Sequence, residues 1–208
     1  MSSADYYRSV AARYQERFTK GPLKRLRNKE RRAVTEALSP QAGDTILDAG
    51  CGTGFDAVPL MKAGCDVYGV DLSAEMVEVA RERGVNADVA NLETLDLGRE
   101  FDKVLCCGAL EFCPNPEAAL GRMAKHVRPG GMLVLLYPVP SIWGYAYKVY
   151  HRLNRVRITL FSDPHIRQMV SDAGLTLDNM TKPAPFTGVL VARRPHSTHR
   201  DRSQRTQS

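Results

Sequence analysis

Residues 46–54 read ILDAGCGTG and decide how the rest of the chain is organised. A short apolar run ends in Asp48, and Gly50, Gly52 and Gly54 follow at alternate positions. Glycines directly after a strand let the backbone turn sharply and approach a ligand with no Cβ in the way. A following helix would point its N–H groups at that ligand. The segment therefore predicts a nucleotide-type binding loop, and the alternative is a glycine-rich connection that binds nothing.

The composition is that of a single globular domain. The chain has 208 residues, of which 43% are hydrophobic and 25% charged, which favours one domain with a full core. No apolar run approaches the roughly 20 residues of a membrane span, and the N-terminus lacks the apolar core of a secretory signal. The spacing of the five cysteines fits neither a disulfide framework nor a zinc site. We therefore expect a reduced, cytoplasmic protein with no metal site.

Charge is distributed unevenly along the chain. Residues 1–40 carry ten basic and four acidic side chains, residues 41–140 eight and fifteen, and residues 141–208 eleven and four. The net charges of the three parts are therefore +6, −7 and +7. Basic flanks attract an anionic substrate, an anionic membrane surface or nucleic acid. The alternative is that they form a solvated helix face and a disordered tail.

Strands and helices alternate through the middle of the chain, which is typical of βαβ units and a parallel sheet. Strands are expected at about 44–48, 66–71, 85–88, 101–106 and 132–137, with helices at 54–63, after Ser73, and at 114–127. Further helices at 141–154 and 163–173 precede a hairpin of two last strands, 175–181 and 186–193. The sequence thus predicts an α/β fold: a Rossmann-like, doubly wound sheet of seven strands, mostly parallel with an antiparallel final strand.

Extra helices are expected before this sheet. A short helix is predicted within residues 4–19, and residues 22–38 repeat apolar side chains at helical spacing opposite a basic face. We expect a single domain over residues 1–194, with residues 1–40 as an N-terminal helical lid. Residues 195–208 are polar and basic, so they are expected to form a disordered tail.

Acidic residues end the second and third expected strands. Asp71 ends the second strand, within VYGVDLS at 67–73. An acid at this place can accept hydrogen bonds from both ribose hydroxyls of a nucleoside. The alternative, a helix cap, is weaker because Ser73 is a better N-cap. Asp88 ends the third strand and could instead be an ordinary loop acid.

These segments, together with FDKVLCCGALEF at 101–112, resemble the motifs of class I S-adenosylmethionine (SAM)-dependent methyltransferases in order and spacing. They most resemble the group that includes the ubiquinone and menaquinone biosynthesis enzymes. The resemblance covers about residues 44–137 and extends to Tyr6, Tyr7 and Tyr14. Many relatives carry His where this chain has Phe112, so histidine-based proton abstraction at that position is in doubt.

The resemblance implies a binding site for SAM, with S-adenosyl-L-homocysteine (SAH) as the product. It implies that Tyr14 covers the cofactor, that Asp71 binds the ribose, and that Asp88 and Val89 bind the adenine. Cys107 is expected to contact the cofactor through its backbone, whereas Cys106 is expected to be a buried filler. The other implied cofactor-binding residues are Asp48, Gly50, Cys51, Gly52, Gly54 and Leu72.

The methyl acceptor is expected to be a small organic molecule, lipophilic or anionic in character. It should contact the first 20–30 residues and residues 138–165, which flank the strand ends where open α/β sheets bind ligands. Residues 143–152, WGYAYKVYHR, fit a lid over an aromatic substrate, a lipid interface or a helix packed into the core. No spacing singles out a catalytic residue, and the candidate bases are Glu111, His151, His165 and Tyr7.

Several other functions compete with a small-molecule methyltransferase. One is a lipid or quinone methyltransferase in peripheral contact with an anionic membrane, and another is a non-catalytic SAM-binding module. A nicotinamide-dependent oxidoreductase is disfavoured because the glycine spacing differs from Gly-x-Gly-x-x-Gly and no Tyr-x-x-x-Lys pair is present. Nucleic acid is a disfavoured partner because the chain has no Asn-Pro-Pro-Tyr-like sequence and no RNA-binding module. The sequence predicts no oligomeric state.

Overall fold

The computed structural model describes residues 23–196, and residues 1–22 and 197–208 lie outside the described part. The first half of the fold comprises α2 (Leu23–Leu38), β1 (Thr45–Ala49), α3 (Ala57–Lys62), β2 (Asp66–Asp71), α4 (Ala74–Glu82), β3 (Asn86–Val89), η1 (Leu92–Thr94) and β4 (Phe101–Cys107). The second half comprises η2 (Leu110–Phe112), α5 (Pro116–Lys125), β5 (Val127–Pro138), α6 (Ile142–Leu153), α7 (Asp163–Asp172), β6 (Thr176–Ala184) and β7 (Thr187–Arg193).

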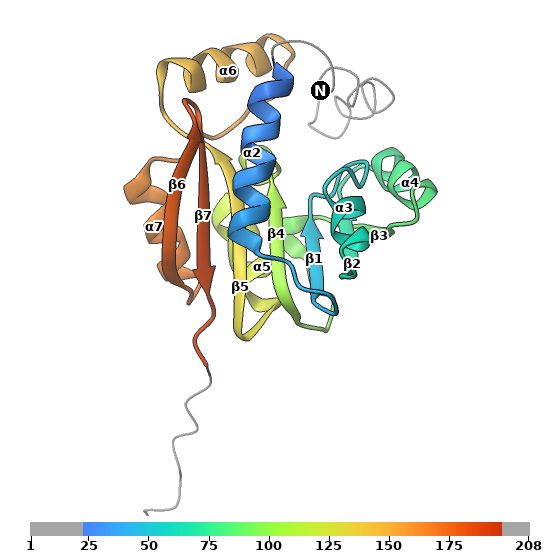
Figure 1. The fold of residues 1–208 in the computed structure, drawn as a ribbon. Coiled ribbons are helices and arrows are strands. Elements are labelled where there is room, and N and C mark those ends of the chain that lie inside the picture. The colour runs from blue at the N-terminus through green and yellow to red at the C-terminus, as the bar shows by residue number, and fades with distance from the viewer. Residues whose placement is uncertain (1–22, 197–208) are drawn as a thin grey trace, which may run out of the picture.

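The strands form one seven-stranded sheet in the order β3-β2-β1-β4-β5-β7-β6 (Figure 1). The neighbours from β3 to β5 pair in parallel, whereas β7 runs antiparallel to both β5 and β6. The strand order reverses between β1 and β4, and open α/β sheets bind ligands at the carboxyl ends of the strands on either side of such a point. The predicted fold class is confirmed.

Alternating side chains direct the two faces of the sheet toward two separate cores. Leu47 and Val104 belong to the core that contains α5 and α7 residues. Ile46 directly precedes Leu47, and Leu105 directly follows Val104. Both belong to the core that contains residues of α2, α3 and α4. Successive residues of a strand point to opposite faces, so nearly unbroken apolar strands supply both cores.

Helix α2 packs directly on the sheet. Its buried residues include Val34 and Leu38, which join the core on that face. Glu30 is also buried, and its Oε1 accepts a hydrogen bond from the Thr187 hydroxyl of β7 at 3.0 Å. The described part of the expected lid therefore forms one of the outer layers of the fold (Figure 1). The predicted helix at 4–19, Tyr6, Tyr7, Tyr14 and most of the predicted tail lie outside the described residues.

Three elements differ from the expected boundaries by more than two residues, and one of them is β6, which ends at Ala184 and not at 181. β5 begins at Val127, five residues before the expected start, because Val127 pairs with Phe101 before a bulge shifts the register to Lys103 and Met132. α3 begins at Ala57 because the turn that contains the glycines continues to Asp56.

None of the helices within residues 23–196 combines the length and the apolar character that are needed to cross a membrane.

A buried ion pair joins Asp44, directly before β1, to Lys103 of β4. It lies at the amino ends of these strands, away from the cavity end of the sheet. The Lys103 ammonium lies 2.6 Å from Asp44 Oδ2 and also donates to the Ser39 carbonyl at 2.7 Å. The Lys103 side chain is only 9% exposed. A buried charge that loses its partner is strongly destabilising, so this pair connects the end of α2 to the sheet.

We expect Asp44→Ala to lower the free energy of unfolding by about 3 kcal/mol, because it leaves the Lys103 ammonium buried without a carboxylate. Urea denaturation measures the change. Asp66→Ala is the matched control, because Asp66 is an exposed acid at the same end of the sheet. An equal, small loss in both variants would contradict the role of the ion pair.

Candidate active site

The turn after β1 is shaped by glycine backbone geometry. Gly50 has φ +80°, and a Cβ there would lie 2.2 Å from the Cβ of Ala109. The N–H groups of Gly50 and Cys51 both donate to the carbonyl of Val70, at 2.7 and 3.0 Å. The chain therefore turns tightly between β1 and β2, in a conformation that a side chain at Gly50 would block.

Asp71 ties the end of β2 to this turn. One carboxylate oxygen accepts the N–H of Gly52 at 2.9 Å and the other accepts the N–H of Ser73 at 2.9 Å. Burial raises the pKa of the Asp71 carboxyl, although the two amide donors act in the opposite direction. A Cβ on Gly52 would meet no atom within 4 Å, so the backbone of the turn faces open space beside an acid.

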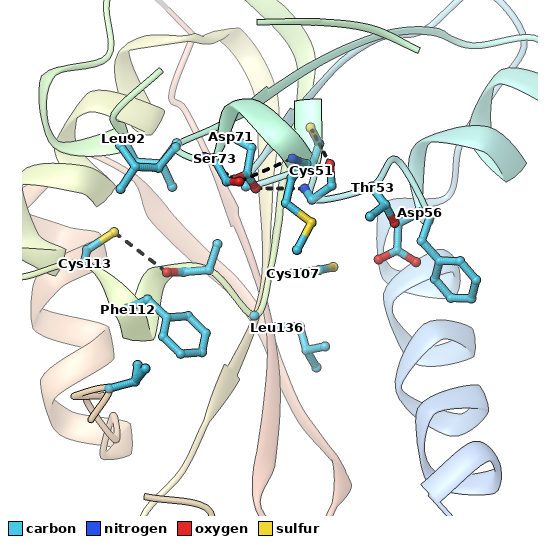
Figure 2. Close-up of a pocket in the computed structure, with 18 of the residues that line it drawn as sticks. Cys51, Thr53, Asp56, Asp71, Ser73, Leu92, Cys107, Phe112, Cys113 and Leu136 are labelled. Atoms are coloured by element: carbon cyan, nitrogen blue, oxygen red, sulfur yellow. Dashed lines mark hydrogen bonds between the residues drawn. The ribbon is translucent and has the colours of Figure 1, made fainter. Parts of the chain in front are cut away.

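That space is a cavity of about 720 Å³ at the carboxyl ends of the strands. Its volume falls within the range of about 300–1,000 Å³ that is usual for small-molecule sites. Figure 2 shows Asp71, Ser73 and the Cys51 turn along one edge, Phe112 and Cys113 opposite them, and Cys107 and Leu136 between. The cavity thus spans both sides of the topological switch point.

Six of the predicted cofactor residues line this cavity: Gly50, Cys51, Gly52, Asp71, Leu72 and Cys107. Asp48 and Gly54 lie behind the wall. Asp48 is 2% exposed, and burial together with Asp56 and Asp71 holds its pKa well above the ordinary value. A Cβ on Gly54 would lie 2.7 Å from Val85, so this glycine allows the turn to pack against the next unit of the fold.

Asp88 and Val89 point elsewhere. Asp88 accepts a hydrogen bond from the Tyr68 hydroxyl and forms a 2.7 Å ion pair with Arg81. The Tyr68 hydrogen bond lowers the pKa of the Asp88 carboxyl. Neither predicted residue lines the cavity, whereas Asn91 and Leu92 do. An adenine role for Asp88 and Val89 stays a prediction, and the sequence reasoning missed the residues that are three positions further on.

Helix α2 holds the outer wall of the turn. Arg31 forms a 2.9 Å ion pair with Asp56 and donates to the Phe55 carbonyl at 3.2 Å. Its guanidinium also lies 4.0 Å from the centre of the Phe55 ring, a cation–π contact. The position of α2 therefore supports the cofactor-side wall of the cavity, which the sequence did not reveal.

Basic side chains from two segments that are distant in the sequence line the same cavity. Lys24 and Arg27 come from α2, and Arg155 and Arg157 come from the segment that follows α6. Both segments lie within the ranges predicted to contact the acceptor. The N–H of Val156 donates to the His151 carbonyl, and that of Thr159 to the Glu111 carbonyl, both at 2.9 Å. These bonds hold the basic segment against η2.

The cysteines near the site are buried or half-buried. All five cysteines of the chain are thiols, and Cys106 is fully buried, as expected for a filler. Burial raises the pKa of the Cys107 thiol well above its ordinary value, and nearby Asp56 and Asp48 act in the same direction. A protonated thiol is a poor nucleophile. Within residues 23–196 no cluster of three or more potential metal ligands occurs.

Of the candidate bases, Glu111 lies next to Phe112, which lines the cavity. It is 3% exposed and sits in η2, directly after β4. His151 packs edge-on against the rings of Phe112 and Tyr147, and burial lowers its pKa to about 4. His165 lies at the surface, 3.0 Å from Glu117. The fourth candidate, Tyr7, is outside the described residues.

Comparisons with known proteins agree with the fold and the cavity described above. The methyltransferase-domain family matches residues 47–135, which run from β1 to β5. The chain is 30% identical over 173 residues to the demethylmenaquinone methyltransferase of Paenarthrobacter aurescens, covering 70% of this chain and 68% of that protein. The chain belongs to the class I methyltransferase family. This membership confirms the resemblance that the sequence motifs indicated.

Two further comparisons describe one relative in sequence and one solved structure of similar fold. The ubiquinone biosynthesis O-methyltransferase of Xanthomonas axonopodis pv. citri (strain 306) is 35% identical over 144 residues, 64% of this chain and 59% of that protein. The chain spans about three fifths of the length of such relatives. The solved structure of the magnesium protoporphyrin IX methyltransferase of Synechocystis PCC 6803 with bound SAH matches this structure with a TM-score of 0.73 and 22% sequence identity. The match covers 92% of this chain and 97% of that chain. This chain therefore has a fold similar to that of the solved structure.

Proposed function

We propose that this chain is a SAM-dependent methyltransferase that acts on a small organic acceptor. The observation that carries the proposal is the Asp71 carboxylate, which lies beside a bare glycine turn in a cavity of about 720 Å³. The two relatives quoted above are named as a ubiquinone biosynthesis O-methyltransferase and a demethylmenaquinone methyltransferase. SAM, when bound, supplies an activated methyl group on a sulfonium.

The residues that line the turn would hold the cofactor. Asp71 would accept the ribose hydroxyls through the carboxylate oxygens that now accept backbone N–H groups. The backbone at Gly50, Cys51 and Gly52 would face the methionine part, and Cys107 would border the methyl group. Asn91 and Leu92 line the cavity beside Asp71, so we propose them for the adenine. The protein mainly aligns the reacting groups, which supplies roughly 7–11 kcal/mol of the barrier.

The basic side chains of the cavity favour an acceptor that carries a negative charge. Lys24, Arg27, Arg155 and Arg157 are among its lining residues. Arg155 and Arg157 flank the buried Val156, which fixes the backbone between them. Guanidinium groups bind carboxylates and phosphates with good geometry. An aromatic or lipophilic acid therefore fits the lining better than a neutral molecule.

A membrane-surface location is the second proposal, and the exposed face of α6 favours it. Ile142 is 82% exposed, Trp143 62% and Leu153 79%. They are therefore not core residues, and the interpretation of this segment as core is wrong for Trp143. Exposed basic residues, Lys148 and Arg152, lie on the same helix. Apolar and aromatic side chains combined with basic ones suit binding to an anionic lipid surface.

Calorimetry with SAH and NAD tests the proposed function. We expect wild-type protein to bind SAH and to show no comparable binding of NAD. Asp71→Asn should weaken SAH binding about 10- to 100-fold, because the ribose hydroxyls lose a carboxylate acceptor. Asp66→Asn, an exposed acid at the other end of β2, serves as the control and should bind SAH normally.

Binding of NAD without SAH would overturn the proposal. SAH binding without methyl transfer from radiolabelled SAM to any acceptor in a panel of hydroxylated aromatic acids would favour the non-catalytic alternative.

The charge of the acceptor is tested with a matched pair of probes on SAH-saturated protein. We expect 3,4-dihydroxybenzoate to bind about tenfold more tightly than 3,4-dihydroxybenzyl alcohol, because only the acid can pair with the guanidinium groups. The double variant Arg155→Ala/Arg157→Ala should remove this preference, whereas Lys125→Ala, on the exposed surface of α5, should retain it. Equal binding of the two probes by wild-type protein would contradict an anionic acceptor.

Vesicle flotation tests the membrane proposal. We expect the protein to float with vesicles that contain phosphatidylglycerol and not with vesicles of phosphatidylcholine alone. Trp143→Ser/Leu153→Ser should lose most of the floated fraction, because two large apolar side chains no longer enter the lipid. Equal flotation with both vesicle types, or unchanged flotation of the double variant, would count against lipid contact through α6.

A further inference from the structure

Helix α6 ends in a Schellman motif, in which the chain turns back through one residue of left-handed conformation. The N–H of Val156 donates to the carbonyl of His151 at 2.9 Å, and the N–H of Arg155 donates to the carbonyl of Arg152 at 3.0 Å. Arg155 is the left-handed residue, with φ +62°. Glycine is the usual residue at this position of the motif, because a Cβ makes the left-handed conformation unfavourable.

Three other helices within residues 23–196 end in the same motif, and all three have glycine at the left-handed position. They are α3 with Gly64, α4 with Gly84 and α7 with Gly174, whose φ values are +88°, +84° and +74°. In each of them the residue after the glycine donates its N–H to the carbonyl five residues earlier, at 3.1 Å. The chain therefore meets this backbone requirement with glycine three times, and Arg155 is the exception.

No contact within the described part of the chain explains why an arginine is at this position. Among residues 23–196, the Arg155 side chain forms no ion pair, no hydrogen bond and no cation–π contact. The side chain is exposed, so it does not fill a core. Unfavourable backbone conformations that persist in proteins are concentrated at ligand-binding sites. The arginine side chain at this position is therefore more useful to a ligand than to the fold.

The segment after α6 is fixed so that its arginines lie at the large cavity. Arg155 and Arg157 both line that cavity, and both are exposed. The residues that alternate with them, Val156 and Ile158, are 2% and 5% exposed. These two pack in a small core with Phe112, which also lines the cavity. The apolar residues thus anchor the segment, and the basic ones are left on the side of the cavity.

The two arginines after α6 differ from the other arginines of the cavity in their partners. Four arginines of the described chain line it, two from α2 and two from this segment. Arg27 of α2 pairs with Glu30 at 3.2 Å, and Arg31 pairs with Asp56 at 2.9 Å. Arg155 and its neighbour two positions on have no acidic partner within residues 23–196. Their charge is therefore not offset by a carboxylate of the described protein.

We propose that Arg155 determines the specificity of the acceptor site by binding a carboxylate of the methyl acceptor, with Arg157 binding the same group. A guanidinium matches a carboxylate with two parallel N–H···O bonds, which a glycine at this position could not supply. The inference rests on the proposed methyltransferase function and deepens it. It names the residue that selects an acid over a neutral molecule of the same shape, and it implies that this selection lowers the stability of the protein.

Substitution of Arg155 by glycine tests both consequences at once. Arg155→Gly should raise the melting temperature of the ligand-free protein by about 2–4 °C, because glycine accepts the left-handed conformation. On SAH-saturated protein, calorimetry should show that the roughly tenfold preference for 3,4-dihydroxybenzoate over 3,4-dihydroxybenzyl alcohol falls below about threefold. An arginine with a merely structural role would give the opposite pair of results: a lower melting temperature and an unchanged preference.

The reverse exchange in α7 is the matched control. Gly174 has the same place in the same motif, an added Cβ there would meet no atom within 4 Å, and the residue does not line the cavity. Gly174→Arg should lower the melting temperature by about 2–4 °C and keep the preference for the acid. Arg155→Lys should keep the wild-type melting temperature and part of the preference, because an ammonium retains the charge without the planar fork.

Two results would overturn the inference. One is a preference for the acid that is absent from wild-type protein or that survives in Arg155→Gly, and the other is an Arg155→Gly melting temperature that does not rise. SAH affinity, measured in the same titrations, separates this failure from that of the proposed function. Wild-type protein that binds SAH would leave the proposed function standing, whereas wild-type protein that does not bind SAH would refute the proposed function itself.

Discussion

The site depends on one carboxylate, that of Asp71, which accepts the N–H groups of Gly52 and Ser73. One bond holds the turn after β1, and the other holds the start of α4, so a single side chain joins two neighbouring βα units. The bonds are made in a buried place where the carboxylate has given up water, which raises its pKa. The cavity exists because the backbone on both sides is held at this acid.

Most of the fold follows from local patterns in the chain. β2 has the predicted range, Asp66–Asp71, and Ser73 caps α4 by accepting the Met76 N–H. Boundaries were missed where pairing between distant residues decides them. Val127 joins β5 only because it pairs with Phe101 across a bulge, and a bulge depends on the neighbouring strand. The helix that the sequence predicts within residues 4–19 lies outside residues 23–196 and stays a prediction.

The candidate site was predictable on the cofactor side and much less so on the acceptor side. The glycine turn, Asp71 and Cys107 lie at strand ends, which a sequence pattern locates well. The family resemblance implies Asp88 for the adenine, which stays a prediction; its side chain bonds to Tyr68 and Arg81, and Asn91 is a residue that lines the cavity. The basic residues of α2 and those after α6 line one cavity only because of tertiary packing. No periodicity in the sequence predicts this.

Gly188 of β7 pairs with Tyr137 of β5, and this pairing carries a consequence for how the protein can vary. A side chain at position 188 would overlap the tyrosine ring and its oxygen, so a larger residue there requires a smaller one at 137. Covariation between these two positions is therefore expected among relatives of this chain.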